Sequence, residues 1–553
     1  MKKRRILIVG GVAGGASAAA RLRRLCEDCE IVIFERGAYV SFANCGLPYY
    51  IGDVISEESD LLLASPKLFR ERFNIDVRLH NEVLAIHREQ REITVMDRTT
   101  QQTYTEPYDA LILSPGASPL RPRLPGVDLP GVFALRTIPD SQQIRAWIQE
   151  KQAKRAVIIG AGFIGLEMAE NLHHRGLSVT MVEMAPHVLP ILDDDVAYYA
   201  EQHLLAHGVR LHLGDGLTGL SHDEHQTLVV HTQKGLRIEA DIVILAVGVR
   251  PETTLARDAA LQIGERGGIR VDEHMQTSDP HIWAVGDAVE VQDTLHRSAL
   301  LMPLAGPANR QGRIAADHIM GRSSAFRGVQ ATAICGIFDL TVATTGCSEN
   351  ILRKMGHPHY EKIYLHPSHH VGYYPGAKAI HIKLLFDTND GRILGAQAIG
   401  EAGVDRRIDV LAMAIQMNAT VFDLEESELC YAPQYGAAKD PINLAGMIAS
   451  NVLKKDLPLA HWDQLESNAL LLDVREMHEK TETFCPDALQ IPLSQLRERI
   501  HELPKNQPIR TFCKYGQRGY YATRVLLQHG LDAANLSGGL LSFHATHSRL
   551  HRT

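Results

Sequence analysis

Short apolar runs followed by glycine-rich turns mark the first part of this chain. Residues 6–9 form such a run and lead through a glycine turn into a predicted helix and a second strand at 30–34. Residues 156–159 repeat the plan, with a glycine turn, a predicted helix over 166–174 and a strand at 178–182. Two units of strand, turn, helix and strand predict two mononucleotide-binding folds.

The pattern changes twice beyond residue 330. Residues 330–450 are predicted to form strands, followed by a helix rich in alanine and methionine at 409–417. A polar break then introduces a last block, at Lys454-Lys455-Asp456-Leu457-Pro458. A chain of 553 residues is expected to hold several domains, at roughly 100–200 residues for each.

Composition excludes several classes of protein. Hydrophobic residues make up 45% and charged residues 22%, as in ordinary globular proteins. The net charge of −8 offers no basic field for nucleic acid or an anionic membrane. Eight cysteines are too few for a disulfide scaffold and suit a reducing cytoplasm.

We expect no membrane insertion, because no apolar run reaches about 18 residues. The basic residues 2–5 are followed by a strand and a glycine turn rather than by a signal-peptide cleavage site.

The second glycine turn has the regular spacing of a dinucleotide site, Gly160-Ala161-Gly162-Phe163-Ile164-Gly165. Its glycines allow a tight turn, a close approach of the pyrophosphate, and packing of the helix on the strand. Glu183 follows at the end of the next strand, where a carboxylate binds the adenosine ribose and repels a 2′-phosphate, so NADH is favoured over NADPH. Residues 241–251 add a strand and turn at Gly248.

The first turn is less regular, Gly10-Gly11-Val12-Ala13-Gly14-Gly15, because Val12 stands where a middle glycine is usual. Glu35 is the ribose-binding candidate, with Arg36 beside it. Since hydride from a nicotinamide needs an acceptor, a second dinucleotide site in the same chain points to a flavin. Three further segments fit it: the strand and small turn ending in Ser114-Pro115-Gly116, the strand and turn of the same form at 241–251, and Asp287, whose carboxylate can bind a ribityl hydroxyl.

This ordered set of segments resembles the FAD-dependent pyridine nucleotide-disulfide oxidoreductases over residues 1–450. The resemblance implies an α/β protein with two Rossmann-like dinucleotide-binding domains and an α+β dimerisation domain. It assigns FAD to residues 1–120 and 250–325, NADH to 121–249, and dimerisation to 326–452. A homodimer is expected.

The family usually carries a pair of redox-active cysteines, but this chain has one in the matching segment, Ser41-Phe42-Ala43-Asn44-Cys45-Gly46-Leu47-Pro48-Tyr49. That segment is similar to the single-cysteine branch of coenzyme A-disulfide reductases, NADH oxidases and peroxidases, and persulfide reductases. A lone cysteine must work through a mixed disulfide, a persulfide or a sulfenic acid. Cys45 is the expected redox sulfur, with Ser41 and Asn44 as accompanying site residues.

The same resemblance implies that tyrosines of the partner subunit reach the cysteine, and Tyr373 and Tyr431 match. They could protonate or orient a leaving thiolate; the alternative is that they are packing aromatics. Coenzyme A carries phosphates and needs cations. The candidates are Arg21, Arg24, Lys67, Arg72 and Arg310.

Other cysteines and histidines do not suggest a metal. Cys26 and Cys29 have CxxC spacing but no second ligand pair. His366, His369 and His370 are clustered in sequence, yet nothing nearby completes a site. No metal is predicted.

The last block carries Leu472-Asp473-Val474-Arg475-Glu476, a loop that begins at Cys513, and Asn535-Leu536-Ser537-Gly538-Gly539. With these segments, residues 462–553 resemble an α/β rhodanese domain. A loop after an apolar strand, Cys513-Lys514-Tyr515-Gly516-Gln517-Arg518, would direct backbone N–H groups at one sulfur. Cys513 is expected to carry a persulfide beside Arg518; the alternative is a vestigial module.

Both resemblances point to sulfane sulfur chemistry. They imply an NADH-dependent flavoprotein reductase of coenzyme A persulfide, polysulfide or coenzyme A disulfide, working through Cys45, with Cys513 as a sulfur carrier. One alternative is an NADH oxidase or peroxidase that cycles Cys45 through sulfenic acid, for which a sulfur carrier has no use. Another is a slow redox-sensing flavoprotein.

Overall fold

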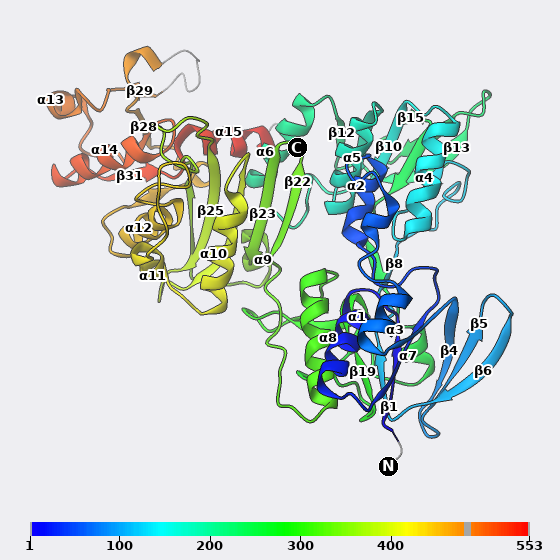
Figure 1. The fold of residues 1–553 in the computed structure, drawn as a ribbon. Coiled ribbons are helices and arrows are strands. Elements are labelled where there is room, and N and C mark those ends of the chain that lie inside the picture. The colour runs from blue at the N-terminus through cyan, green and yellow to red at the C-terminus, as the bar shows by residue number, and fades with distance from the viewer. Residues whose placement is uncertain (1–2, 480–487, 551–553) are drawn as a thin grey trace. The chain divides into compact units, whose positions relative to one another are not determined.

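The computed structural model describes residues 3–479 and 488–550 of the chain (Figure 1). It divides into two compact units. Unit 1 comprises Met1–Pro186 and Val209–Val329, and unit 2 comprises His187–Gly208 and Gln330–Thr553. In the described part of the chain, no helix has the length and apolar character needed to cross a membrane.

The first sheet of unit 1 is parallel, in the order β19-β7-β1-β2-β3. Its strands are β1 (Arg5–Val9), β2 (Glu30–Glu35), β3 (Asp76–Leu79), β7 (Ala110–Leu113) and β19 (Ile282–Ala284). The strands β1 and β7 consist almost wholly of buried apolar residues, as expected for a parallel sheet covered on both faces. The helices α1 (Ala13–Leu25) and α8 (Ala305–Ile319) pack against each other.

The second sheet of unit 1 repeats the arrangement in the order β12-β11-β10-β16-β9. Its strands are β10 (Arg155–Ile159), β11 (Ser178–Glu183), β12 (Arg210–Leu213), β16 (Ile242–Leu245) and β9 (Val132–Phe133). Its helices are α4 (Ile138–Glu150) and α5 (Phe163–His174). The two predicted mononucleotide-binding folds are therefore confirmed.

Smaller elements complete unit 1. Antiparallel sheets are formed by β4 (Asn81–His87), β5 (Glu92–Asp97) and β6 (Gln102–Pro107), by β13 (Leu217–His222), β14 (Leu228–Thr232) and β15 (Arg237–Ala240), and by β8 (Ala117–Pro119) with β17 (Val249–Pro251). A further small sheet contains β18 (Ile269–Arg270), β20 (Val289–Gln292) and β21 (Ala299–Leu301). The short helices are α2 (Leu47–Ile51), α3 (Pro66–Phe73) and α7 (Thr254–Asp258).

Unit 2 contains an antiparallel sheet in the order β22-β23-β26-β25-β24. Its strands are β22 (Ala333–Ile337), β23 (Leu340–Gly346), β24 (Tyr360–Leu365), β25 (Ile380–Asp387) and β26 (Ile393–Gly400). Its helices are α6 (Asp194–Ala206), α9 (Glu349–Lys354), α10 (Val404–Gln416), α11 (Val421–Glu426) and α12 (Pro441–Leu453). The helix expected at 409–417 is α10, which begins earlier, directly after Gly403.

The last block of unit 2 is a second sheet, parallel, in the order β27-β31-β30-β28-β29. Its strands are β27 (Leu459–Ala460), β28 (Leu470–Asp473), β29 (Leu489–Gln490), β30 (Ile509–Phe512) and β31 (Ala533–Leu536). The helices α13 (Leu496–Arg499), α14 (Gln517–Gln528) and α15 (Gly539–Leu550) accompany it. Leu472, Ile509 and Leu526 belong to its buried core.

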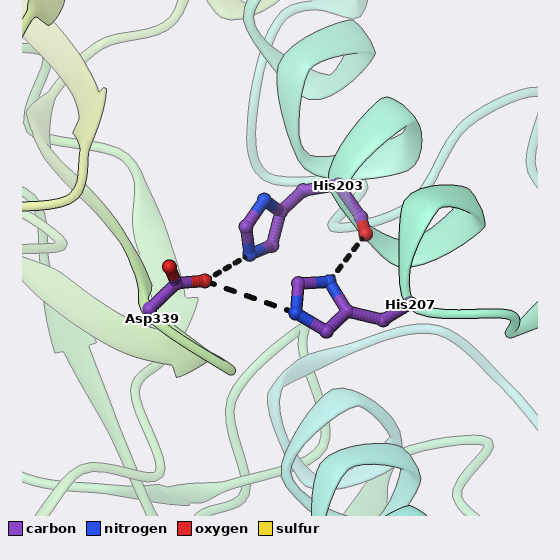
Figure 2. A group of neighbouring side chains, drawn as sticks. All are labelled: His203, His207 and Asp339. Atoms are coloured by element: carbon purple, nitrogen blue, oxygen red, sulfur yellow. Dashed lines mark hydrogen bonds and ion pairs between the residues drawn. The ribbon is translucent and has the colours of Figure 1, made fainter.

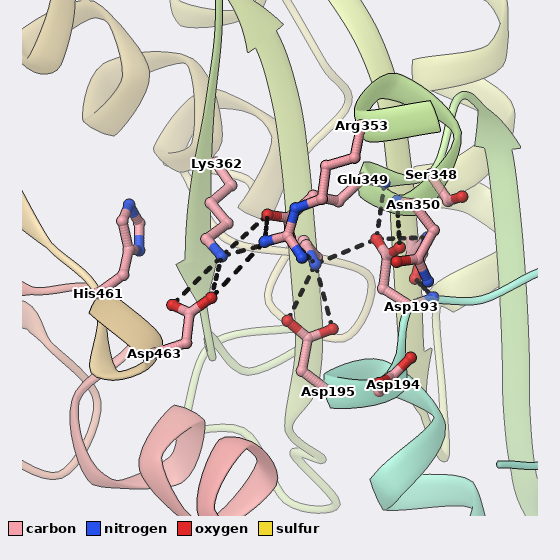
Figure 3. A network of polar contacts seen from close by, with 12 residues as sticks. Asp193, Asp194, Asp195, Ser348, Glu349, Asn350, Arg353, Lys362, His461 and Asp463 are labelled. Atoms are coloured by element: carbon pink, nitrogen blue, oxygen red, sulfur yellow. Dashed lines mark hydrogen bonds and ion pairs between the residues drawn. The ribbon is translucent and has the colours of Figure 1, made fainter. Parts of the chain in front are cut away.

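A buried network of charges joins the parts of unit 2 (Figure 3). Lys383 of β25, which is 1% exposed, lies 3.0 Å from Asp193, 2.9 Å from Asp195 and 2.8 Å from Glu349. Lys362 of β24 bridges Glu349, at 3.1 Å, and Asp463 of the last block, at 3.2 Å. Although burial opposes it, these lysines hold the pKa of Glu349 well below its usual range. The charges thus tie α6, the antiparallel sheet and the last block together.

We expect Lys383→Met to destabilise unit 2 strongly, because two buried carboxylates and a partly buried one would lose their shared cation. Breaking a buried ion pair on one side costs about 3–5 kcal/mol. The urea midpoint should fall when it is followed by the fluorescence of Trp462 in a protein whose Trp147 and Trp283 are replaced by phenylalanine. Lys378→Met is the control, because Lys378 is half exposed and pairs with Glu401 at the surface. Equal midpoints for the two variants would contradict this reading of the network.

Candidate active sites

The two glycine turns of unit 1 have matching geometry. Gly10 and Gly160 take φ values of +91° and +103°, which L side chains rarely adopt. A Cβ atom on Gly10 would collide with the carbonyl oxygen of Ser114, and one on Gly160 with that of Ala246. Each turn is therefore packed against the end of the neighbouring strand so closely that only glycine fits.

The first turns of the helices that follow these glycine turns have no capping side chain. The residue before α1 is Val12 and that before α5 is Gly162; neither makes a side-chain cap hydrogen bond, and neither helix has an acidic residue in its first turn. The N–H groups of both helix starts are therefore left for an anion such as a pyrophosphate. A Cβ built on Gly162 meets nothing within 4 Å, so the protein leaves space there.

The two predicted ribose-binding acids lie at the edges of these turns. Glu35 accepts N–H bonds from Gly11, at 3.1 Å, and Gly37, at 2.9 Å. Glu183 is held in the same way by Ala161, at 2.6 Å, and Ala185, at 2.7 Å. The first turn with Glu35 forms a cradle that fits FAD, and the second turn with Glu183 forms a cradle that fits NADH. In each cradle the glutamate is held in place by hydrogen bonds from its own turn.

The remaining flavin candidates converge from distant parts of unit 1. Ser114 follows β7 at the first turn, and Asp287 lies in the short 3₁₀ helix η3 (Gly286–Ala288). Arg136 pairs with Asp287 at 2.9 Å and reaches toward Gly116. Sequence reasoning did not single out Arg136, because an arginine between two domains carries no pattern of its own.

The other predicted cofactor residues are placed as follows. Pro115, Ala13, Gly14 and Gly15 lie within the first cradle, and Arg36 is exposed after β2. Phe163, Ile164 and Gly165 begin α5, and Gly248, with φ of +101°, lies between β16 and β17.

Cys45 lies in the short 3₁₀ helix η1 (Asn44–Gly46), directly before α2. Ser41 donates its backbone N–H to the carbonyl of Gly11 at 2.8 Å and so ties this segment to the first nucleotide turn. The cysteine is exposed, yet the protein around its sulfur desolvates a thiolate. This desolvation, with the carboxylates of Glu167 and Asp287, raises the pKa of the thiol, and Arg136 opposes the shift.

Glu167 is a residue near Cys45 that the sequence analysis missed. Burial raises the pKa of its carboxyl to about 7, and Tyr49 donates a long hydrogen bond to it at 3.5 Å. Its position on α5, just after the regular glycine turn, was the available signal. A single glutamate on a helix shows no pattern, however, until the fold brings it toward α2.

Tyr373 and Tyr431 meet in unit 2, although 58 positions separate them in the sequence. Their hydroxyl groups are 2.8 Å apart, and the side chains are 75% and 45% exposed. The hydrogen bond with Tyr373 raises the pKa of Tyr431. The pair offers two hydroxyls at the surface.

The five cations predicted to bind coenzyme A are not equivalent. Arg21 is bound to Asp317 of α8 at 2.7 Å and is largely buried, so it does not share an open face with the exposed Arg24. Lys67 is exposed, 3.9 Å from Glu71, and Arg72 is exposed on the same helix, α3. Arg310 stacks over Phe326 at 5.2 Å.

The loop of the last block has the predicted order of strand, loop and helix. Cys513 follows β30 and is 1% exposed, and α14 begins after Gly516. Arg518 donates to Glu479 at 2.8 Å, and this bond lowers the pKa of Glu479 to about 2. The same carboxylate, and then the Cys513 sulfur, raise the pKa of Arg518. The cation thus lies beside the sulfur but is shared with Glu479.

Two of the remaining cysteines form a disulfide that the sequence did not lead us to expect. Cys26 and Cys29 are joined in a disulfide, a pairing that the sequence analysis did not anticipate. The clustered histidines have separate partners. His366 contacts His381, and His369 contacts the backbone of Lys378. His370 lies beside His369 but contacts the carbonyl of Val371.

Two dinucleotide cradles in one unit, with a cysteine near both, define a flavoprotein that passes electrons from a nicotinamide to sulfur. The family model of the pyridine nucleotide-disulphide oxidoreductases matches residues 4–312, and that of their dimerisation domain matches 332–440. A rhodanese-like domain matches 458–546. The chain therefore belongs to the pyridine nucleotide-disulphide oxidoreductase family and carries a rhodanese-like domain, and with the family it uses FAD and NADH.

Relatives with similar arrangements are known. The coenzyme A disulfide reductase of Staphylococcus haemolyticus is 36% identical over 450 residues, which cover 81% of this chain and all of that protein. The reduced CoADR-RHD of Bacillus anthracis has a TM-score of 0.97 and 46% identity, covering 99% of both chains. The NAD-dependent persulfide reductase of A. fulgidus has a TM-score of 0.92 and 34% identity, covering 98% of this chain and all of that chain.

We expect Gly162→Ala to impair NADH binding without unfolding the protein. The added methyl meets no protein atom within 4 Å, yet it enters the space in which a pyrophosphate must approach the backbone. The KM for NADH should rise by about tenfold, equivalent to about 1.4 kcal/mol, while the thermal midpoint stays unchanged. Gly165→Ala is the contrasting variant, because its methyl would collide with the carbonyl of Gly160 and should lower the midpoint. An unchanged KM in Gly162→Ala would contradict this placement of the nucleotide.

Proposed function

We propose that this chain is an NADH-dependent reductase of coenzyme A persulfide, polysulfide or coenzyme A disulfide, acting through Cys45. One observation carries the proposal: a single cysteine near both dinucleotide cradles stands in the same chain as a rhodanese-like loop with its cysteine retained. Because the segment Ser41–Tyr49 has one cysteine where the family usually has a pair, Cys45 must form its sulfur–sulfur bond with the substrate. The names of the relatives support coenzyme A disulfide or a persulfide as that substrate.

The chemistry at Cys45 has two stages. With coenzyme A disulfide, the Cys45 thiolate forms a mixed disulfide and releases one coenzyme A thiolate. With coenzyme A persulfide, it takes the outer sulfur as Cys45–S–SH and releases coenzyme A thiolate. FAD, held by the first glycine turn and Glu35, would supply two electrons taken from NADH. Those electrons would cleave the new bond, restore the Cys45 thiolate and release the second coenzyme A thiolate or HS⁻.

The tyrosine pair gives this chemistry a proton source. We propose that the chain is a homodimer in which Tyr373 and Tyr431 approach Cys45 of the partner subunit, as the family's dimerisation domain suggests. Their mutual hydrogen bond leaves one hydroxyl proton free to donate to the leaving thiolate. Ser41 and Asn44 would then hold the cysteine segment in place.

The cations near the flavin domain would hold the phosphates of coenzyme A. Arg24, Lys67, Arg72 and Arg310 are the exposed members of this group, and Arg21 would join them only if its bond to Asp317 opened.

We propose that the FAD domain comprises residues 1–120 and 250–325, the NADH domain 121–249, the dimerisation domain 326–452 and the rhodanese domain 462–553. We also propose a cytoplasmic location, where NADH and reduced thiols are at hand.

Cys513 would act as the sulfur carrier. Its thiolate takes the outer sulfur of a donor, such as a persulfide, and releases the donor as a thiolate. The charge of Arg518 beside it would stabilise the persulfide anion. An NADH oxidase or peroxidase has no use for this second cysteine, so the rhodanese-like loop favours sulfur transfer over oxygen chemistry.

Anaerobic NADH oxidation tests the reductase function. The wild type should turn over with coenzyme A persulfide, with coenzyme A disulfide or with both. Cys45→Ser should lose at least about a thousandfold of this activity, because the covalent intermediate cannot form. Flavin reduction by NADH in a stopped-flow instrument should be unchanged in the variant and serves as the internal control.

The result distinguishes the three candidate functions: a reductase of sulfur–sulfur bonds, an oxidase or peroxidase, and a redox sensor. A Cys45→Ser enzyme with full activity on both substrates would refute the mechanism. Rapid turnover only with oxygen or hydrogen peroxide would favour the oxidase or peroxidase. Negligible turnover with every acceptor would favour a redox sensor.

The carrier function predicts a separate phenotype for Cys513→Ser. This variant should lose sulfur transfer from thiosulfate to cyanide, because the persulfide cannot form, yet keep the wild-type rate with coenzyme A disulfide. Arg518→Ala should weaken sulfur transfer by about tenfold or more, since a charge-assisted contact contributes roughly 1.5–3 kcal/mol. Sulfur transfer that survives in Cys513→Ser would exclude the carrier function.

A further inference from the structure

Three side chains of unit 2 converge where α6 ends and the hairpin of β22 and β23 turns (Figure 2). His203 lies in the last turn of α6, and His207 follows the helix directly. Asp339 lies in the tight turn between β22 and β23. The spacing of four residues places both imidazoles on one side of the helix.

The donor atoms of these residues are at distances suited to metal binding. Oδ1 of Asp339 lies 2.7 Å from Nε2 of His203 and 3.9 Å from Nε2 of His207. One ligand atom from each residue can be chosen so that all lie within 4.8 Å of one another. A tetrahedral zinc ion with bonds of about 2.1 Å needs its ligand atoms about 3.4 Å apart, so small shifts of these side chains would reach its geometry.

The surroundings orient the two imidazoles. Nδ1 of His207 is 2.9 Å from the backbone carbonyl of His203; a proton there leaves Nε2 of His207 with a free lone pair. Phe338 stacks on the ring of His207 at 4.1 Å and fixes its plane. Nε2 of His203 is buried, and its contact with Asp339 lacks hydrogen-bond geometry, so among the described residues this nitrogen has no hydrogen-bond partner.

We propose that His203, His207 and Asp339 form a binding site for a divalent transition-metal ion of the zinc type. Two imidazole nitrogens and a carboxylate oxygen are its ligands, a set that zinc accepts. Asp339 is 66% exposed, which leaves a fourth position open to water. The ion joins α6 to the β22–β23 hairpin, and it is independent of the coenzyme A reductase function proposed above.

Zinc binding to the full protein tests the site by equilibrium dialysis at micromolar free Zn²⁺, with the bound metal counted by atomic emission. The thiols of the chain also bind zinc, so the decisive quantity is the difference between variants. Wild type should hold one more zinc per chain than His207→Ala and Asp339→Asn, each of which should bind this ion about a hundredfold more weakly. Gln202→Ala, at an exposed position of the same helix, should match wild type.

Two further measurements keep the test independent of folding defects. Asp339→Asn changes an exposed turn residue, so its thermal midpoint without metal should equal that of wild type. Zinc should raise the midpoint of wild type and Gln202→Ala, but not that of Asp339→Asn. Anomalous diffraction at the zinc edge should locate the ion between the three side chains. Equal zinc content in wild type and Asp339→Asn, or binding only at millimolar zinc, would overturn the proposal and leave an ordinary His–Asp ion pair.

Discussion

The close packing of each glycine turn against the end of a neighbouring strand is the constraint on which unit 1 depends. At Gly10 and Gly160 the backbone comes so near the next strand that a side chain cannot be accommodated. This contact directs the uncapped start of the following helix outward and places Glu35 or Glu183 at the edge of the turn. The cradle for a dinucleotide is therefore made of backbone, and side chains only delimit it.

The same constraint positions the reactive sulfur. Because Ser41 bonds to the backbone of Gly11, the segment that carries Cys45 is attached to the first turn. Burial, and then the nearby carboxylates, raise the pKa of the Cys45 thiol, and Arg136 acts against them. The thiolate needed for the proposed chemistry thus depends on a local balance of charges, to which Glu167 and Asp287 contribute from separate parts of the chain.

Unit 2 is held by charges rather than by apolar packing alone. A single buried lysine, Lys383, pairs with three carboxylates from two segments, and Lys362 extends the network to Asp463 in the rhodanese-like block. Buried ion pairs of this kind stabilise little when complete, but the loss of one partner leaves an uncompensated buried charge. The network is thus a reason for the rhodanese-like block to have one defined attachment to the antiparallel sheet.

The sequence by itself determined the features that depend on local backbone requirements. A turn with positive φ, a strand buried on both faces and a helix start without an acid each demand particular residue types at fixed spacing. Both dinucleotide folds and the order of the four parts could therefore be predicted, and the candidate cysteines could be singled out. Only the tertiary structure decided which groups from distant parts of the chain meet, because such contacts leave no periodic pattern in the sequence. The pairing of Arg136 with Asp287, the approach of Glu167 to Cys45 and the hydrogen bond between Tyr373 and Tyr431 are of this kind. So is the ion pair of Arg21 with Asp317, although Arg21 was one of the cations expected to bind coenzyme A.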